Sequence, residues 1–327
     1  MSLPAKKSSP AVPQVPLVFM GTPEFGKTLL AGLVELGYNV VGIVTQPDRP
    51  VGRDRVLTPS PVKEYAVEHK LPLLQPTKLD ESSLRAIQAW KPDLIVVAAY
   101  GKILPEKILS LPGLGCLNVH ASLLPRWRGA SPVQNALIAG DPVTGITLMH
   151  MDAGLDTGNI VSQKSLAIPP EATTGSLLPQ LATLGVELLQ ETLPAWIKRT
   201  ITPQVQNEKE VTLCQLIERE DGRIYWSNSA EEIYNRYRGL SPWPGIFTFW
   251  KRGDDLLRVK LLRVSLQRTS PMLESPLGTV FEIGEKIGVH AGTGILFLEE
   301  VQLEGKSPVN IRDFQNGNPD FVGSLLV

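Results

Sequence analysis

The sequence has few of the residues that build disulfide scaffolds and metal centres. It contains two cysteines and four histidines in 327 residues. Cys116 and Cys214 are far apart and belong to no CxxC pair, which argues against a disulfide scaffold and a zinc site and favours a reducing, cytoplasmic location. His69, His150 and His290 lack histidine, cysteine or carboxylate partners at ligand spacing. We therefore expect no metal in this protein.

Long apolar runs and an excess of charge are also lacking. No run reaches the roughly 20 apolar residues that a membrane-spanning helix needs, so no membrane partner is expected. The net charge is −1, so that any nucleic-acid partner must be argued from local charge. Residues 1–15 are rich in Pro, Ser, Ala and Lys without the apolar core of a secretory signal, and we expect a disordered tail. Nothing in the sequence demands a dimer, and a monomer is expected.

Apolar runs alternate with amphipathic stretches through the first 200 residues. We expect strands at 17–20, 39–45, 73–76, 93–99, 115–117, 146–151 and 160–168, and helices at 23–36, 61–70, 80–90, 131–139 and 174–198. This alternation predicts the α/β class, with an open, largely parallel Rossmann-like sheet that carries helices on both faces.

The pattern changes after residue 200. Residues 201–218 are polar and irregular and are the expected linker between a catalytic domain, 16–200, and a C-terminal domain, 219–327. In the latter, a helix at 229–238 precedes short strands near 246–250, 256–264, 278–282, 286–290 and 295–303. Such spacing, with turn signals between the strands, predicts a small β-barrel.

Three polar residues follow the apolar runs in the middle of the chain. Asn118 and His120 are two residues apart, so on a strand they point to the same face. An irregular loop, Ser122–Gly129, comes next, and Asp156 follows the apolar run that ends near His150, in a glycine-flanked loop. Ligands of open α/β sheets bind beyond the carboxyl ends of strands, so these residues can share one site. A structural histidine and a surface loop remain the alternative.

Asn118, His120, Asp156 and the loop Ser-Leu-Leu-Pro-Arg-Trp-Arg-Gly together resemble the formyltransferase family that uses 10-formyltetrahydrofolate. The resemblance implies that these three residues are the catalytic set. Asn118 would then donate a hydrogen bond to the oxyanion, and Asp156 would orient His120. It also implies folate contacts from the loop and from the strand end after residue 99, where core packing is the alternative; the residues concerned are Ser122, Leu123, Leu124, Pro125, Ile103 and Leu104.

The same resemblance implies formyl transfer to an amine, and two features favour members that act on initiator methionyl-tRNA. The first is the long loop 46–61, which in such members enters the acceptor stem and here carries Arg53 and Arg55 as candidate contacts. The second is the C-terminal barrel, which such members have as an OB-like, nucleic-acid-binding fold. Phe25 is a candidate wall for the acceptor's side chain, or else a core aromatic. Arg126 and Arg128 could neutralise folate carboxylates or tRNA phosphate, or face solvent.

Three other functions stay open at this point. A formyltransferase that acts on an amino sugar nucleotide also has a C-terminal domain, although the basic loop favours tRNA. The glycinamide ribonucleotide enzyme typically lacks a second domain. A folate- or RNA-binding protein without catalysis would not need the complete set of Asn118, His120 and Asp156.

Overall fold

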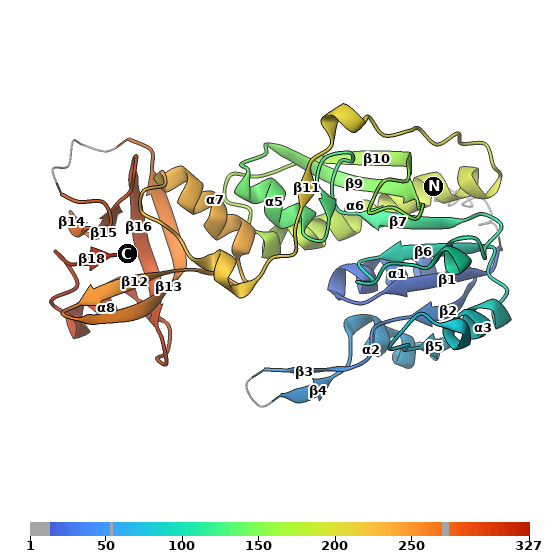
Figure 1. Ribbon diagram of the computed structural model, residues 1–327, viewed down its shortest axis with the longest axis horizontal. Coiled ribbons are helices and arrows are strands. Elements are labelled where there is room, and N and C mark those ends of the chain that lie inside the picture. The colour runs from blue at the N-terminus through green and yellow to red at the C-terminus, as the bar shows by residue number, and fades with distance from the viewer. Residues whose placement is uncertain (1–13, 53–54, 270–274) are drawn as a thin grey trace, which may run out of the picture. The chain divides into compact units, whose positions relative to one another are not determined.

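The computed structural model describes residues 14–52, 55–269 and 275–327, so that the predicted tail lies almost wholly outside the described residues. The chain forms two compact units (Figure 1). The first runs to Gly129 and adds Gly145–Leu166 and Pro179–Leu213, while the second comprises Ala130–Thr144, Ala167–Leu178 and Cys214–Val327. The predicted domain limits at residues 200 and 219 stay a prediction about which parts fold independently.

A seven-stranded sheet forms the centre of the first unit. Its strand order is β10-β9-β7-β6-β1-β2-β5. Neighbours from β7 to β5 are parallel, whereas β9 pairs antiparallel with β7. The strands are β1 (Leu17–Gly21), β2 (Val40–Val44), β5 (Leu73–Leu74), β6 (Leu94–Ala98), β7 (Cys116–His120), β9 (Val143–His150) and β10 (Asn159–Ala167). The predicted fold class, α/β with an open and largely parallel sheet, is confirmed.

Helices cover both faces of this sheet because its central strands are apolar on both sides. On one face, β1 and β6 pack with Ile87 of α3 and Ile108 of α4. On the other, α1 and α6 pack together, and Gly185 of α6 lies against Leu29 of α1 and Val119 of β7. Asp80 caps α3 as predicted, its carboxylate accepting from two backbone N–H groups. The helices are α1 (Glu24–Glu35), α2 (Pro61–Glu68), α3 (Glu81–Ala89), α4 (Glu106–Leu109) and α6 (Thr174–Ile197).

The stretch 46–61, expected to be a structureless loop, contains a β-hairpin. Strands β3 (Arg49–Val51) and β4 (Val56–Thr58) pair antiparallel and stand away from the sheet of the first unit (Figure 1). The ion pair between Lys63 and Asp48, 2.6 Å long, anchors the base of the hairpin. Pairing of the two strands satisfies backbone N–H and C=O groups of this projecting segment. The irregular composition gave no sign of these short strands.

The second unit contains the predicted barrel. Its sheet has the order β14-β15-β16-β13-β12-β18, with β17 paired to β16. Hydrogen bonds from Val280 to Ser324 and from Leu326 to Gly278 join the two ends of this order and close the barrel. The core includes Trp250, packed edge-on against Phe321. The strands are β12 (Ile246–Arg252), β13 (Asp255–Gln267), β14 (Val280–Ile283), β15 (Lys286–His290), β16 (Ile295–Leu303), β17 (Val309–Asn310) and β18 (Leu325–Leu326).

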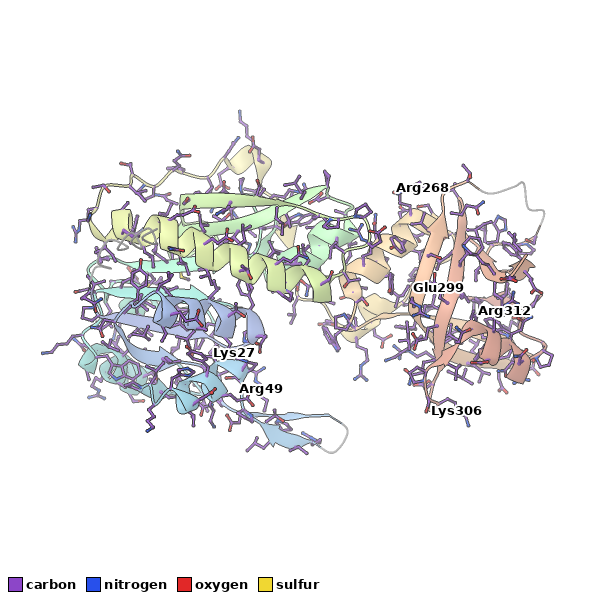
Figure 2. The ribbon with its side chains drawn as sticks, turned by 180° about the vertical axis from the view of Figure 1, so that it is seen from behind. Lys27, Arg49, Arg268, Glu299, Lys306 and Arg312 are labelled. Carbon is purple, nitrogen blue, oxygen red and sulfur yellow. The ribbon has the colours of Figure 1, made fainter. Side chains whose placement is uncertain are left out.

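Helices of the second unit include α5 (Pro132–Ile138), α7 (Ala230–Leu240) and α8 (Ile311–Gly317). Ser229 and Glu232 form a capping box that begins α7. Figure 2 labels Arg312, which belongs to α8. Its guanidinium forms an ion pair of 2.6 Å with Glu282. Two short strands lie elsewhere in the chain, β8 (Arg128–Gly129) and β11 (Leu213–Cys214). No helix within 14–52, 55–269 or 275–327 is long and apolar enough to cross a membrane.

Candidate active site

The carboxyl ends of the parallel strands meet at one edge of the sheet, as expected for an α/β fold. The carbonyl of Tyr100, after β6, accepts from Thr22 Oγ1 at 3.1 Å and from Gln46 Nε2 at 3.0 Å. Thr22 follows β1 and Gln46 follows β2. Three segments that are distant in sequence are therefore joined at this edge, and β7 ends beside them with His120.

Asn118, His120 and Asp156 form a cluster at the end of β7, as the sequence predicted. Asn118 Nδ2 donates to Asp156 Oδ1 at 3.3 Å, and His120 Nδ1 lies 3.6 Å from Asp156 Oδ2. The side chains of His120 and Asp156 are 6% and 12% exposed. The backbone N–H of Gly129 donates to Asp156 Oδ2 at 2.9 Å. Two donors thus fix the carboxylate in a place with little water.

His120 is oriented chiefly by a backbone carbonyl. Its Nε2 lies 2.9 Å from the oxygen of Trp127. Since a carbonyl only accepts, Nε2 must carry the proton of this bond. Nδ1 therefore faces Asp156 with a lone pair in the neutral ring and with a second N–H in the imidazolium. At 3.6 Å the separation of Nδ1 from the carboxylate oxygen is an ion-pair distance rather than a hydrogen-bond distance.

The loop that carries Asp156 does not reach the site in the way that the sequence suggested. We expected it to follow a strand that points to the same edge as β7, but β9 is antiparallel and runs away from that edge. The chain must turn back over residues 151–158. A side chain at Gly158 would collide with the carbonyl of His150, and Asp156 has a φ of 53°, in the left-handed region. The predicted cluster is formed, although by a return loop rather than by a second strand end.

The loop after His120 is held by its own polar groups. Ser122 is fully buried and its hydroxyl donates to the carbonyl of Arg126 at 2.6 Å. Thr147 of β9 donates to the carbonyl of Ser122 at 2.7 Å and accepts from the backbone N–H of Leu124 at 3.0 Å. The side chain of Ser122, a candidate folate contact, is therefore committed to the loop. What the loop presents to a ligand is its backbone, its apolar side chains and the exposed side chain of Arg126.

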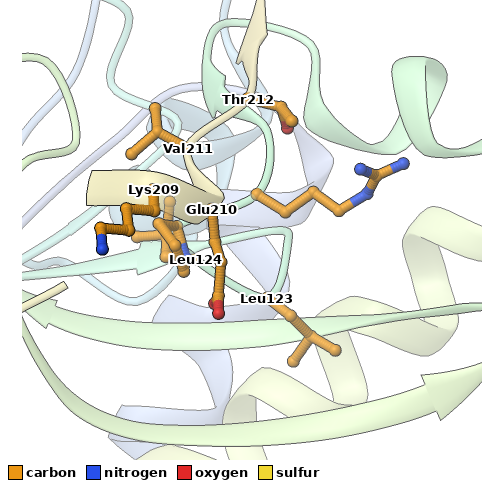
Figure 3. Close-up of a pocket in the computed structure, with 8 residues that line it drawn as sticks. Leu123, Leu124, Lys209, Glu210, Val211 and Thr212 are labelled. Atoms are coloured by element: carbon orange, nitrogen blue, oxygen red, sulfur yellow. The ribbon is translucent and has the colours of Figure 1, made fainter. Parts of the chain in front are cut away.

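A cavity of about 560 Å³ lies along this loop (Figure 3). It is lined by two segments of the first unit, one around Leu123 and Leu124 and the other around Lys209 and Glu210. Its size is within the range of small-molecule sites. None of the three clustered polar residues lines it, so the cavity is separate from the cluster. The remaining lining residues are Pro125, Arg126, Val211 and Thr212.

The other candidate residues have different environments. Leu104 is 4% exposed and belongs to the hydrophobic core, whereas Ile103 is 82% exposed. Phe25 is buried in the first turn of α1. Arg55 is exposed at the end of the β3–β4 turn, with a φ of 50°. Arg53 lies outside the described residues.

The two arginines of the loop differ. Arg126 is exposed and stacks on Trp127, its guanidinium 4.5 Å from the ring centre. Arg128 is 4% exposed and donates to Gln206 Oε1 at 3.0 Å and to Glu208 Oε1 at 2.7 Å. The arginine lowers the pKa of the Glu208 carboxyl. The solvent-facing alternative for Arg128 is therefore wrong.

Sequence reasoning missed Gln206. This side chain is 4% exposed, and its amide donates to the carbonyls of Asp156 and Gly158, both at 2.7 Å. The residue lies in the polar stretch that we expected to be a linker, which has no periodicity to distinguish a buried amide from an exposed one. Nothing in the sequence pattern could have found it.

The described part of the chain has no group of three or more His, Cys, Asp or Glu side chains that could hold a metal ion. Burial raises the pKa of the Tyr100 phenol to about 12, so this hydroxyl stays protonated at neutral pH. The cluster itself offers the amide of Asn118, the imidazole of His120 and the carboxylate of Asp156.

Proteins of known sequence are similar to this chain over nearly its whole length. The methionyl-tRNA formyltransferase of Lysinibacillus sphaericus is 43% identical over 304 residues, covering 92% of this chain and 95% of the relative. That of Myxococcus xanthus is 44% identical over 310 residues, covering 94% of this chain and 96% of the relative.

Solved structures share the fold. An N-formyltransferase from Helicobacter canadensis, in complex with folinic acid and dTDP-3-aminofucose, is 17% identical with a TM-score of 0.63 and covers 87% of this chain and 99% of that one. HypX from Aquifex aeolicus, in complex with tetrahydrofolic acid, is 14% identical with a TM-score of 0.61; the match covers 95% of this chain and 48% of HypX. Methionyl-tRNA formyltransferase from Clostridium thermocellum is 21% identical with a TM-score of 0.53, over 77% of this chain and 94% of that one.

The match extends to family models of both parts of the chain. The model described as formyl transferase fits residues 15–193, which include the whole polar cluster, and the model of the formyl transferase C-terminal domain fits residues 216–319. With both models in chain order and relatives above 40% identity, this chain belongs to the formyl transferase family.

Proposed function

We propose that this protein transfers the formyl group of 10-formyltetrahydrofolate to the α-amine of methionyl-tRNA, giving N-formylmethionyl initiator tRNA. The cluster of Asn118, His120 and Asp156 is the observation that carries the proposal, because it supplies a donor and two proton-handling groups within one buried space. The named relatives, 42–44% identical over more than nine tenths of the chain, support methionyl-tRNA as the acceptor.

The transfer makes one C–N bond and breaks another. The lone pair of the acceptor amine attacks the formyl carbon, and negative charge develops on the formyl oxygen. As the charge returns, the bond from carbon to N10 of the folate breaks, and N10 keeps the electron pair. The amine loses one proton and N10 gains one, so that the reaction needs no oxidant or reductant.

Asn118 is the donor that we assign to the developing oxyanion. Its amide has two N–H groups, and one is directed to Asp156 Oδ1. That bond orients the amide, leaving the second N–H for the substrate. One preorganised donor of this kind lowers the barrier by about 3–4 kcal/mol.

His120 and Asp156 are the groups that we assign to proton removal from the amine. The ammonium form of an α-amine has a pKa of about 8, so a modest driving force produces the nucleophile at neutral pH. When the imidazole takes the proton at Nδ1, the ring becomes a cation 3.6 Å from the Asp156 carboxylate, which stabilises it. The carbonyl of Trp127 keeps the ring in the required orientation.

Two surfaces are proposed for recognition. The cavity beside the cluster, which Leu123, Leu124 and Pro125 help to line, suits the folate donor, whereas Leu104 does not line this cavity. The exposed β3–β4 hairpin, with Arg55, and the barrel are assigned to the tRNA. A protein with this role in translation initiation is expected in the cytoplasm, and we propose that it acts as a monomer.

The test is formyl transfer by the purified protein from 10-formyltetrahydrofolate to methionyl-tRNA, with a 4-amino sugar nucleotide as the parallel acceptor. We expect formylation of the tRNA alone. Transfer to the sugar alone would replace the acceptor while leaving the cluster's role intact. Absence of transfer to both would contradict the proposal.

A further inference from the structure

Resting on the proposed function, we infer that Gln206 is a positioning residue that holds Asp156 in the geometry required for transfer. Its buried amide donates to the carbonyls of Asp156 and Gly158, both at 2.7 Å. The residue comes from the stretch 204–212, which passes along the site after α6 and which we call the brace. The backbone of Gln204 fixes the start of the brace through two hydrogen bonds of 2.8 Å with Ile160.

Asp156 needs such support because no strand places it. β9 runs away from the site, and the return loop is stabilised by few apolar contacts, since residues 152–155 are exposed. The left-handed φ of Asp156 is a conformation that non-glycine residues adopt at some cost. An external donor on the carbonyl of that residue fixes its peptide plane and offsets this cost.

The orientation of the Gln206 amide is determined by Arg128. A guanidinium only donates, so the oxygen of the amide must face Arg128 Nε, 3.0 Å away, and the N–H groups must face the loop. The guanidinium is itself held by Glu208. An amide whose orientation is fixed keeps its N–H groups directed at the two carbonyls, which a freely rotating amide would not do.

The same dipeptide supports both ends of Asp156. The N–H of Gly129 binds the carboxylate, while the adjacent Arg128 side chain holds the Gln206 amide that binds the carbonyl. The backbone and the side chain of Asp156 are therefore both held in place by the segment of Arg128 and Gly129. A displacement of about 1 Å at such a site can cost as much as about 100-fold in rate, so loss of the amide should act on turnover.

Two substitutions remove the donor without changing the length of the side chain much. Gln206→Glu keeps an acceptor for Arg128 but turns a carboxylate oxygen toward the two carbonyls, and Gln206→Met removes all polar groups. The matched control is Gln204→Glu, the same chemical change two residues away. The side chain of Gln204 is exposed, and its two hydrogen bonds with Ile160 come from its backbone, which the substitution keeps. Circular dichroism and thermal melting establish which variants are folded.

The first readout is the kinetics of formyl transfer to methionyl-tRNA. We expect both Gln206 variants to lower kcat by about 10- to 100-fold with little change in KM for methionyl-tRNA, while the control keeps the wild-type values. In an Asp156→Asn background, the same Gln206 changes should have almost no further effect, because the group that they displace is already gone. Equal losses in both backgrounds would overturn the inference.

The second readout does not depend on the substrate. Hydrogen exchange of peptides that cover residues 152–158 should be faster in Gln206→Glu and Gln206→Met than in the wild type and in Gln204→Glu. Unchanged exchange there would overturn the positioning role, as would unfolding of both Gln206 variants, since a positioning residue requires that the fold stands without it. If exchange differs between the proteins as expected but the wild-type protein forms no product, the proposed function fails while the inference about Gln206 stands.

Discussion

Two segments of the first unit look alike in the sequence and differ in the structure. The hairpin stretch 46–61 and the brace 204–212 are both polar and without periodicity. The hairpin exposes apolar side chains, with Val56 at 62% and Leu57 at 65% exposed, whereas the brace buries the polar Gln206. An exposed apolar and basic hairpin suits the binding of a large partner. A buried, fully bonded amide suits the support of a site. We therefore propose that the hairpin serves binding and that the brace serves chemistry.

The largest effect is expected at the cluster that the brace supports. Asn118→Ala removes the proposed oxyanion donor and should lower kcat by about 100- to 1,000-fold with the fold intact. Single-turnover formylation at saturating substrates measures it. A rate within a few-fold of the wild type would remove Asn118 from the chemistry and leave the brace without a catalytic purpose.

Next in size is a stability effect at the anchor of the brace. Arg128→Met leaves Gln206 Oε1 buried without its donor, and we expect a loss of about 1–3 kcal/mol in the free energy of unfolding. Urea denaturation followed by circular dichroism measures it. Arg126→Met, on the exposed neighbour, is the control and should change stability by less than about 0.5 kcal/mol. Equal effects of the two substitutions would contradict the burial argument.

A smaller effect is expected on the hairpin. Arg55→Glu should raise KM for methionyl-tRNA several-fold, leave kcat unchanged and reduce the salt dependence of binding by about one phosphate contact. Arg85→Glu, the same change on the exposed side of α3, is the control. A fall in kcat instead of a rise in KM would assign the hairpin to chemistry and erase the contrast with the brace.

The smallest effect concerns the start of the return loop. Burial lowers the pKa of His150 in the folded protein, against a partial opposing effect of Asp152. Below its ordinary value of 6.5 the unfolded chain binds this proton more readily than the folded one, so stability falls as pH drops from 6.5 toward the lower folded pKa. His150→Gln should make the free energy of unfolding less dependent on pH in this window. Denaturant titrations at pH 7.5 and 5.5 measure the free energy of unfolding of the wild type and the variant. The same change in this free energy between the two pH values for both proteins would contradict the prediction.

The sequence predicted the fold well where local patterns carry the information. The apolar residues of the strand predicted at 93–99 form the central strand β6, and the short strands predicted after residue 245 form the barrel. Turn and cap residues placed α3 and α7 within a few residues of their observed limits. Such features depend on neighbours in the chain, which a single sequence shows.

The site was predicted less completely because part of it depends on contacts between distant residues. The grouping of Asn118, His120 and Asp156 was correct, but the direction of β9 was not visible, since an apolar strand reads the same in either orientation. The buried roles of Arg128 and Gln206 arise from a pairing across 78 residues of sequence. Ile103 and Leu104 look equivalent in the sequence, yet one is exposed and the other is core.

The division of labour between hairpin and brace is tested most directly by single-turnover formyl transfer at increasing methionyl-tRNA concentration. Wild type, Arg55→Glu and Gln206→Glu are compared at saturating 10-formyltetrahydrofolate. We predict that Arg55→Glu regains the wild-type rate at saturating tRNA, while Gln206→Glu stays about 10- to 100-fold slower at every concentration. Recovery of Gln206→Glu at high tRNA, or failure of Arg55→Glu to recover, would contradict the account.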